Sequence, residues 1–228
     1  MTDLKQVVRD NLAAIQTRIE RAGGDPAVVT VVAAIKQQPA EALDAALAAG
    51  VRDIGENRAD ALVERASASA DPGVRWHFLG QIQRNKVSKL APHVALWQSV
   101  DRAELGPAIA QRAPGAHVLV EVNLTDDPHR GGTSLASVPS LVRDLQRDGL
   151  DVRGLMAVGP LGGPAAARPG FTAVTRCADE LGVPIRSLGM SDDIDVAIEC
   201  GSTMVRVGTA LFGARTSYAP RSAGRNLH

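Results

Sequence analysis

The stretch that decides the fold is Val28-Val29-Thr30-Val31-Val32-Ala33-Ala34-Ile35, followed by Lys36-Gln37-Gln38-Pro39. Its run of β-branched and small apolar residues indicates a strand that is buried on both faces of a parallel sheet. In an open, doubly wound sheet, a glycine-rich phosphate loop follows the first strand. Because Lys36-Gln37-Gln38-Pro39 stands in that place here, the sequence favours a closed barrel over the open sheet.

The rest of the chain alternates strand and helix patterns. Strands are predicted over 28–35, 51–57, 74–80, 94–100, 117–122, 152–158, 184–190 and 202–208, and helices over 4–22, 39–49, 59–70, 85–90, 103–112, 135–148, 171–181 and 194–199. Residues 159–170 hold four glycines and three prolines, which predicts a mobile loop. This alternation predicts a (β/α)8 TIM-type barrel, a single domain over 1–228 with an extra N-terminal helix (1–22) and a polar tail (214–228).

The composition limits the class of partner. The 228 residues are 45% hydrophobic and include 25 basic and 25 acidic side chains, so no net charge attracts nucleic acid or an anionic membrane. The N-terminus lacks a signal-peptide pattern, and no apolar stretch approaches the ~18 residues of a membrane span. Cys177 and Cys200 lack CxxC spacing, which argues against structural zinc and a disulfide framework. We expect a cytoplasmic monomer that binds a small ligand and no metal ion.

Lys36 follows the first strand directly, at the end of the sheet where α/β barrels bind their ligands. We expect a lysine rooted in a buried strand to be partly desolvated, which disfavours its ammonium form and leaves an amine able to attack a carbonyl. That is the chemistry of a lysine that forms a Schiff base. From this stretch alone, the alternative is a side chain that extends from the sheet edge into solvent.

The carboxyl ends of the other strands would lie at the same rim of the barrel. They supply Asn57, His77, Asn123, Met156, Ser191, Arg206, Gly208 and Thr209. Loops after the seventh and eighth strands commonly bind phosphate in such barrels, and Ser191, Gly208 and Thr209 offer hydroxyls and a close backbone approach. The structural alternatives are a helix cap at Ser191 and a tight turn at Gly208 and Thr209.

Two interpretations stay open for each remaining rim residue. Arg206, within an apolar strand, either forms a structural salt bridge or places a permanent cation beside a ligand. Asn57 and Asn123 either cap turns or bond to a ring substituent. Met156 packs in the core or against a ring, and His77 is either a hydrogen-bonded core residue or a catalytic one.

Several segments of the chain resemble a known family. They are Lys36 after its strand, Ile54-Gly55-Glu56-Asn57, Trp76-His77-Phe78-Leu79-Gly80, Arg153-Gly154-Leu155-Met156-Ala157, Leu188-Gly189-Met190-Ser191-Asp192-Asp193 and Gly201-Ser202-Thr203-Met204-Val205-Arg206-Val207-Gly208-Thr209-Ala210-Leu211-Phe212-Gly213. Together they resemble the pyridoxal 5′-phosphate homeostasis proteins, whose barrel is similar to the N-terminal domain of alanine racemase. The resemblance covers nearly the whole chain, and the last two segments are its most specific part.

The resemblance implies a role for each rim residue. Lys36 would hold pyridoxal 5′-phosphate as a Schiff base, Arg206 would face the pyridine nitrogen, and Ser191, Gly208 and Thr209 would bind the phosphate. Asn57 and Met156 would contact the ring, and His77 and Asn123 are further candidates. The implied function is vitamin B6 homeostasis, in which the protein buffers pyridoxal phosphate or delivers it to apoenzymes. Because an arginine at the ring nitrogen weakens the cofactor as an electron sink, we expect no strong turnover.

The alternative within this resemblance is a pyridoxal phosphate-dependent amino-acid racemase. Alanine racemase brings a catalytic tyrosine from a second domain, whereas the only tyrosine here, Tyr218, lies in the predicted tail. Racemisation by two bases would then lack its second base. The chain also departs from the family at Gln37-Gln38, where a second lysine is common, and in the 159–170 loop. A barrel that binds another phosphate, without this cofactor, is a third hypothesis.

Overall fold

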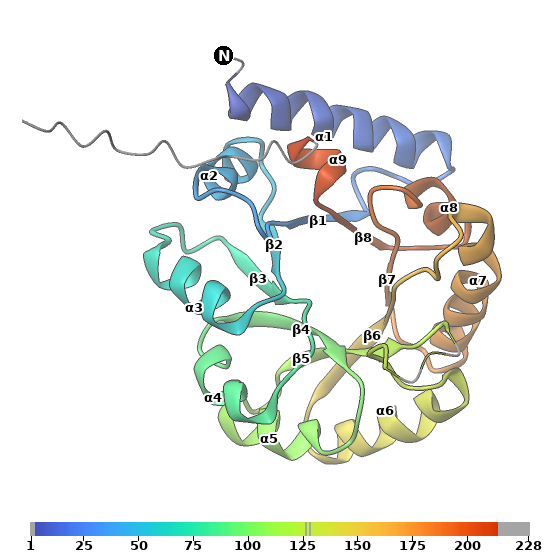
Figure 1. The fold of residues 1–228 in the computed structure, drawn as a ribbon. Helices are drawn as coiled ribbons and strands as arrows, with labels where there is room; N and C mark the ends of the chain where they lie inside the picture. The colour runs from blue at the N-terminus through green and yellow to red at the C-terminus, as the bar shows by residue number, and fades with distance from the viewer. Residues whose placement is uncertain (1–2, 126, 128, 214–228) are drawn as a thin grey trace, which may run out of the picture.

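In the part of the chain that the computed structural model describes, residues 3–125, 127 and 129–213, eight parallel strands close into a barrel with helices around it (Figure 1). The strands pair in chain order, and β8 returns to pair with β1, with Val205 opposite Val31. The predicted (β/α)8 barrel is therefore confirmed. The polar tail predicted over 214–228, with Tyr218, lies outside the described residues.

The elements follow one another in the order α1 (Leu4–Arg21), β1 (Thr30–Ala34), α2 (Glu41–Ala48), β2 (Asp53–Glu56), α3 (Ala59–Ala68), β3 (Arg75–Phe78), η1 (Arg84–Lys86), α4 (Val87–Leu90), β4 (Val94–Val100), α5 (Leu105–Arg112), β5 (His117–Val122), η2 (Leu135–Ser137), α6 (Val138–Arg147), β6 (Asp151–Ala157), α7 (Pro164–Glu180), β7 (Ile185–Leu188), α8 (Ile194–Glu199), β8 (Met204–Val207) and α9 (Thr209–Phe212). Each predicted strand overlaps an observed one, and those over 94–100 and 117–122 have the predicted bounds.

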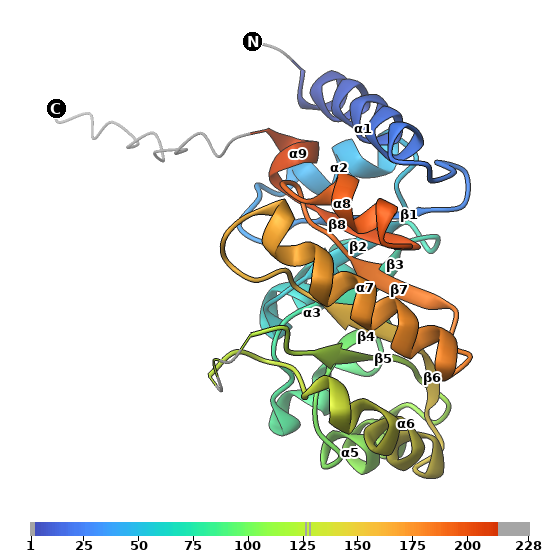
Figure 2. The ribbon, with the colours of Figure 1, turned by 90° about the vertical axis from the view of Figure 1, so that its right-hand side faces the viewer.

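The extra N-terminal helix, α1, is confirmed as well. The Asp3 side chain caps it by accepting a hydrogen bond from the backbone N–H of Lys5 (3.1 Å), as an N-cap residue does. Val8, Ile15 and Ile19 recur at helical spacing and are buried. This apolar face packs against α2, α8 and α9, so α1 covers the side of the barrel where β1 meets β8 (Figure 2).

The strands separate two hydrophobic regions, because successive side chains of a strand point to opposite faces. The larger region lies between the strands and the helices and includes Val205 and Val207 of β8. The smaller one consists of residues that share the barrel interior: Val32, Leu96, Leu119, Met156 and Met204. Polar residues at interior positions of the same strands therefore have to find partners inside the barrel.

The structure corrects the loop predicted over 159–170. Helix α7 begins at Pro164 and runs to Glu180, so only residues 158–163 connect it to β6. Proline at the first helical position favours a helix, because its missing N–H would have no partner there. The alanines at 165–167 are strong helix formers, and burial of Phe171 holds the helix against the barrel. The prediction gave the prolines and glycines too much weight as helix breakers.

Candidate cofactor site

Lys36 lies in a turn just beyond the carboxyl end of β1. The strand ends at Ala34, and the backbone N–H of Ile35 still donates to the carbonyl of Gly55 on β2 (2.9 Å). On the other side of the turn, Arg65 Nη2 donates to the carbonyl of Gln38 (2.8 Å). The turn is thus anchored at both ends, and Lys36 projects from the rim.

Lys36 is not buried in this turn, contrary to the expectation that it would be partly desolvated. The residue is exposed, because the chain leaves the sheet at Ala34 and places Lys36 two positions outside the buried strand. The prediction was therefore wrong on burial, and the alternative of a side chain that extends into solvent describes its position. Lys36 still lies at the end of the barrel where the other candidate residues gather.

The loops after β7 and β8 meet beside the end of β1. Ser191 Oγ accepts a hydrogen bond from the backbone N–H of Ala210 in α9 (3.0 Å). A Cβ placed on Gly208 would lie 3.2 Å from the carbonyl oxygen of Ala34, which is tighter than an ordinary contact. Thr209 is exposed at the start of α9. Ser191, Gly208 and Thr209 are therefore brought together, next to the strand that carries Lys36.

Arg206 is buried in the barrel interior, with 5% of its surface exposed. Its Nη1 donates to the carbonyl (2.5 Å) and the hydroxyl (2.7 Å) of Ser187, and its Nη2 donates to the carbonyl of Ala157 (2.8 Å). The structural salt bridge considered for it is not formed with any described residue. Burial lowers the pKa of Arg206 to about 10, although Glu121 and Asp193 act in the opposite direction.

Asn57 and Met156 occupy different environments. Asn57 follows β2 at the rim and is half-buried, and its backbone N–H donates to the carboxylate of Glu56 (2.7 Å). Met156 is 2% exposed and packs inside the barrel with Leu119 and Met204. The core interpretation of Met156 therefore describes its packing, while Asn57 remains at the rim with Lys36.

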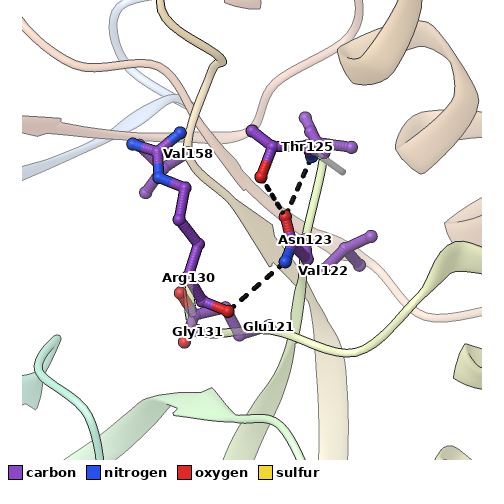
Figure 3. A pocket seen from close by; sticks show the side chains of 8 residues that line it. Glu121, Val122, Asn123, Thr125, Arg130, Gly131 and Val158 are labelled. Carbon is purple, nitrogen blue, oxygen red and sulfur yellow. Dashed lines mark hydrogen bonds between the residues drawn. The ribbon is translucent and has the colours of Figure 1, made fainter. Parts of the chain in front are cut away.

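His77 and Asn123, the two further candidates, have structural partners. His77 is buried inside the barrel, where its ring contacts Asp53 (3.0 Å) and Gln98 (2.6 Å), as the core interpretation required. Asn123 Oδ1 accepts from the backbone N–H (2.9 Å) and the hydroxyl (2.7 Å) of Thr125, and its Nδ2 donates to the carbonyl of Arg130 (3.3 Å) (Figure 3). Asn123 thus organises the loop after β5, as expected of a turn residue.

Three polar residues of the barrel interior were not among the predicted candidates. They are Gln98 on β4, Glu121 on β5 and Ser187 on β7. Each stands at an interior position of an otherwise apolar strand. A polar residue that alternates with apolar ones in a buried strand was the available signal, since such a group needs a partner inside the barrel.

Glu121 lines a pocket of about 220 Å³ at the carboxyl end of the barrel, together with Asn123 and Arg130 (Figure 3). Burial raises the pKa of its carboxyl group to about 7, and the charge of Asp101 adds to this effect. The charges of Arg206 and Arg130 oppose it. A carboxyl group near the carboxyl end of the barrel therefore changes charge close to neutral pH.

Three further properties of the described residues concern membrane spans, metal ligands and thiols. None of the helices within 3–125, 127 and 129–213 is long and apolar enough to cross a membrane. In the same ranges, no group of three or more histidine, cysteine, aspartate or glutamate side chains is arranged to hold a metal ion. The cysteines Cys177 and Cys200 are both free thiols.

Comparison with known proteins gives the class of the barrel. Residues 4–216 match the model of the alanine racemase N-terminal domain family. Alanine racemase of Clostridium difficile 630 is 18% identical with a TM-score of 0.70, and the match covers 92% of this chain and 58% of that one, which is a likeness of fold. The protein is a barrel of the alanine racemase N-terminal domain class.

More similar relatives narrow this class. The pyridoxal phosphate homeostasis protein of Pseudomonas aeruginosa is 37% identical over 94% of this chain and 99% of its own length, and that of Escherichia coli K12 is 36% identical over 91% and 94%. The structure of PipY of Synechococcus elongatus PCC7942 with pyridoxal phosphate bound has a TM-score of 0.80 and 30% identity, covering 90% of this chain and all of that one. The chain belongs to the pyridoxal phosphate homeostasis protein family.

Proposed function

We propose that this protein binds pyridoxal phosphate at the carboxyl end of its barrel and acts in vitamin B6 homeostasis, holding the cofactor and releasing it without strong turnover. Lys36 would hold the aldehyde covalently as a Schiff base. The observation that carries the proposal is the junction of β1, β7 and β8, where the Ser191–Ala210 hydrogen bond and the close approach of Gly208 to Ala34 lie beside the Lys36 turn. The names of the relatives support the same cofactor.

The residues present fit this cofactor chemically. A phosphate needs hydroxyl and backbone donors and a close backbone approach, which Ser191, Thr209 and Gly208 would provide. A Cβ on Gly208 would press against the Ala34 carbonyl and narrow this space. Lys36 is exposed at the rim and accessible to an aldehyde. Asn57 would contact the ring at the rim, Met156 would do so from its packed position inside the barrel, and His77 and Asn123 remain further candidates for the site.

Arg206 would limit the chemistry of the site. Bound pyridoxal phosphate supplies an aldehyde and, in enzymes, an electron sink that depends on a protonated ring nitrogen. A permanently charged guanidinium facing that nitrogen disfavours its protonation. The buried Arg206, held by Ser187 and Ala157, is fixed in place for this role. Storage and delivery suit such a site better than racemisation.

Reduction with borohydride tests the covalent link. We expect one pyridoxyl adduct, on Lys36, when the protein is incubated with pyridoxal phosphate, reduced and analysed by peptide mass spectrometry. Lys36→Ala should lose the adduct and the near-ultraviolet absorption band. Lys89→Ala, a change at an exposed position of α4, is the matched control and should keep both. An adduct on another lysine, or a band that survives in Lys36→Ala, would overturn the proposal.

A second experiment separates this function from an amino-acid racemase. The loaded protein should convert no more L-alanine to D-alanine than free pyridoxal phosphate does, whereas steady turnover that Lys36→Ala abolishes would favour the racemase. Transfer of the cofactor to a pyridoxal phosphate-dependent apoenzyme would identify the proposed partners. The cytoplasmic location, the monomeric state and the treatment of the whole chain as one cofactor-binding domain belong to the same proposal.

A further inference from the structure

A hydrogen-bond chain runs through the barrel interior and ends on Arg206. It consists of five polar side chains whose residues are between 0% and 7% exposed: Asp53, His77, Gln98, Ser187 and Arg206. The successive contacts are Asp53 to His77 (3.0 Å), His77 to Gln98 (2.6 Å), Gln98 to Ser187 (2.7 Å) and Ser187 to Arg206 (2.7 Å). These residues come from β2, β3, β4, β7 and β8, so the chain crosses the barrel from one side to the other.

The direction of the chain at Arg206 follows from elementary chemistry. A guanidinium has donors and no acceptor, so Arg206 Nη1 donates to Ser187 Oγ. The Ser187 hydroxyl must then donate its own proton elsewhere, and the Oε1 of Gln98 lies 2.7 Å away. The amide oxygen of Gln98 therefore faces Ser187, and its NH2 group faces the other way.

Met204 supports this orientation of the Gln98 amide. The Gln98 NH2 group contacts both His77 Nδ1 (2.6 Å) and the Met204 sulfur (3.3 Å), and each of these atoms can accept a hydrogen bond. A reversed amide would place its oxygen against the sulfur lone pairs. His77 Nδ1 is consequently the acceptor, and His77 carries its proton on Nε2, from which it donates to Asp53.

The chain ends on a carboxylate at the amino-terminal end of the barrel. Asp53 is the first residue of β2 and also accepts from Arg75 Nε (2.8 Å). Burial alone would raise the pKa of Asp53, but the hydrogen bonds from His77 and Arg75 outweigh it and hold that pKa at about 2. The hydrogen bonds from Arg206 through Ser187, Gln98 and His77 therefore all run in one direction. They end on Asp53, which is negatively charged at neutral pH.

The hydrogen-bond chain connects the buried Arg206 to a compensating negative charge. A buried cation needs a compensating charge, and Arg206 has no ion pair among the described residues. The carboxyl groups of Glu121 and Asp193 act on it only at longer range. Hydrogen bonds that point the same way polarise one another, so the charge of Asp53 strengthens the acceptor that Ser187 presents to Arg206.

We propose that Asp53 is a positioning residue for the cofactor site, acting through His77, Gln98 and Ser187 to fix the guanidinium of Arg206. This inference rests on the proposed function, because Arg206 is taken to face the cofactor ring. It extends the site beyond the rim to the opposite end of the barrel. Loss of the Asp53 charge should therefore change cofactor binding although Asp53 itself lies outside the site.

Asp151, elsewhere in the protein, provides a matched control for Asp53. Asp151 is the first residue of β6 and likewise accepts from a histidine and an arginine, His117 (2.9 Å) and Arg153 (3.2 Å). That group is exposed and is not connected to Arg206 through the hydrogen bonds described above. Asp53→Asn and Asp151→Asn thus remove the same charge from equivalent strand positions.

Titration with pyridoxal phosphate compares the two variants. Asparagine keeps an oxygen that accepts from His77 but removes the charge that polarises the hydrogen-bond chain, so we expect Asp53→Asn to bind pyridoxal phosphate more weakly, by about threefold to tenfold, with a shifted absorption maximum. Asp151→Asn should match the wild type in both. Ser187→Ala breaks the chain but leaves Arg206 its two carbonyl acceptors, and it should reproduce the Asp53→Asn spectrum. Equal affinities and spectra for all the proteins would overturn the inference.

An NMR measurement tests the chain without relying on cofactor binding. With 15N-labelled histidine, the five histidines of the sequence give few signals, and His77 is assigned from its loss in His77→Asn. Before cofactor is added, we expect His77 to be protonated on Nε2 and unprotonated on Nδ1. Addition of pyridoxal phosphate should shift this signal in the wild type and leave it unchanged in Ser187→Ala.

The outcomes separate the two proposals. Absence of a Lys36 adduct in the wild type would defeat the proposed function, while the tautomer of His77 would still test the direction of the chain. A proton on Nδ1 of His77 would contradict the proposed direction of the hydrogen-bond chain. A wild type that binds cofactor on Lys36, with Asp53→Asn indistinguishable from Asp151→Asn, would leave the function intact and overturn the inference. Thermal unfolding of each variant verifies that it is folded.

Discussion

The hydroxyl of Ser191 accepts a hydrogen bond from the backbone N–H of Ala210, at 3.0 Å, and so joins the loop after β7 to the first turn of α9. Because the oxygen of the Ser191 hydroxyl accepts from Ala210, the proton of this hydroxyl is free to be donated to a phosphate. Ser191→Ala should then weaken pyridoxal phosphate binding about tenfold and lower the free energy of unfolding by about 1 kcal/mol. Spectroscopic titration and urea unfolding measure the two effects.

Ser140→Ala is the control for this prediction. Ser140 is exposed on α6, and its hydroxyl donates to the carbonyl of Ser137 (2.8 Å), far from the cofactor end of β7 and β8. It should leave the affinity unchanged. An affinity of Ser191→Ala equal to that of the control would show that the hydroxyl of Ser191 does not bind the phosphate.

The sequence was sufficient for the barrel because each strand pattern is local. Runs such as Val28 to Ile35 are apolar on both faces, and in a chain of this length eight of them between helices leave few other architectures. Strand ends were also predictable to within a few residues. These ends decide which side chains reach the rim, and the structure has Ser191, Gly208 and Asn57 at the end of the barrel that carries Lys36, while their contacts with the cofactor stay a prediction.

The remaining errors come from interactions that are not local. The exposure of Lys36 depends on where the ladder to β2 stops, which is set by pairing and not by the apolar run. Helix α7 exists because Phe171 packs on the barrel despite Pro169. The partners of His77 come from β2 and β4, and only the closed barrel brings Gln98 and Ser187 together.

Gly80 lies directly against the backbone of Asn57. A Cβ on Gly80 would be 1.9 Å from the carbonyl oxygen of Asn57, and backbone at the end of β2 has little room to move. The carbonyl of Gly80 is also held by the hydroxyl of Ser99 (2.5 Å). Gly80→Ala should therefore lower the free energy of unfolding by about 2 to 4 kcal/mol and weaken cofactor binding through displacement of Asn57.

Urea unfolding and cofactor titration of Gly80→Ala measure these effects. Gly73→Ala is the control, because a Cβ there would meet no backbone, only the side chains of Asp71 (3.1 Å) and Arg52 (4.0 Å), in an exposed turn. It should change the free energy of unfolding by less than ~1 kcal/mol. A near-neutral Gly80→Ala would mean that the ends of β2 and β3 are not packed this closely.

The half-buried carboxyl of Glu121 should make stability depend on pH. Its pKa is about 7 in the folded protein against 4.5 for the free side chain, mainly because of burial. Between these values the folded state retains a proton that the unfolded state releases, so this group favours folding less as the pH rises from about 4.5 to 7. Glu121→Gln removes the titration and should be more stable than the wild type at pH 8, by about 2 to 3 kcal/mol.

The measurement is urea unfolding at pH 5 and at pH 8. The difference between Glu121→Gln and the wild type should be small at pH 5 and should grow toward pH 8. Glu64→Gln, at an exposed position of α3, serves as the control and should show no such growth. The same difference at both pH values would contradict the burial of an ionisable Glu121.

Pro169 lies inside α7, and replacing it tests whether the helix begins as early as Pro164. Proline lacks the N–H that would donate to the carbonyl of Ala165 four residues earlier, and its ring disturbs the preceding turn. Pro169→Ala restores this hydrogen bond at an exposed position. The gain in helix stability, up to about 3 kcal/mol, is partly offset by the greater entropy of the unfolded chain, so we expect a net stabilisation of about 1 to 2 kcal/mol.

Pro164→Ala is the matched control, because a residue at the first helical position gains no intrahelical hydrogen bond from its N–H. It should be neutral or slightly destabilising, by less than ~1 kcal/mol, since only the unfolded chain gains freedom. Urea unfolding compares the two variants. If Pro169→Ala were no more stable than Pro164→Ala, residues 164–170 would behave as the loop that their two prolines and Gly170 predict. A stabilised Pro169→Ala beside a neutral Pro164→Ala requires a helix that already includes residue 165, because only then does the new N–H find its acceptor.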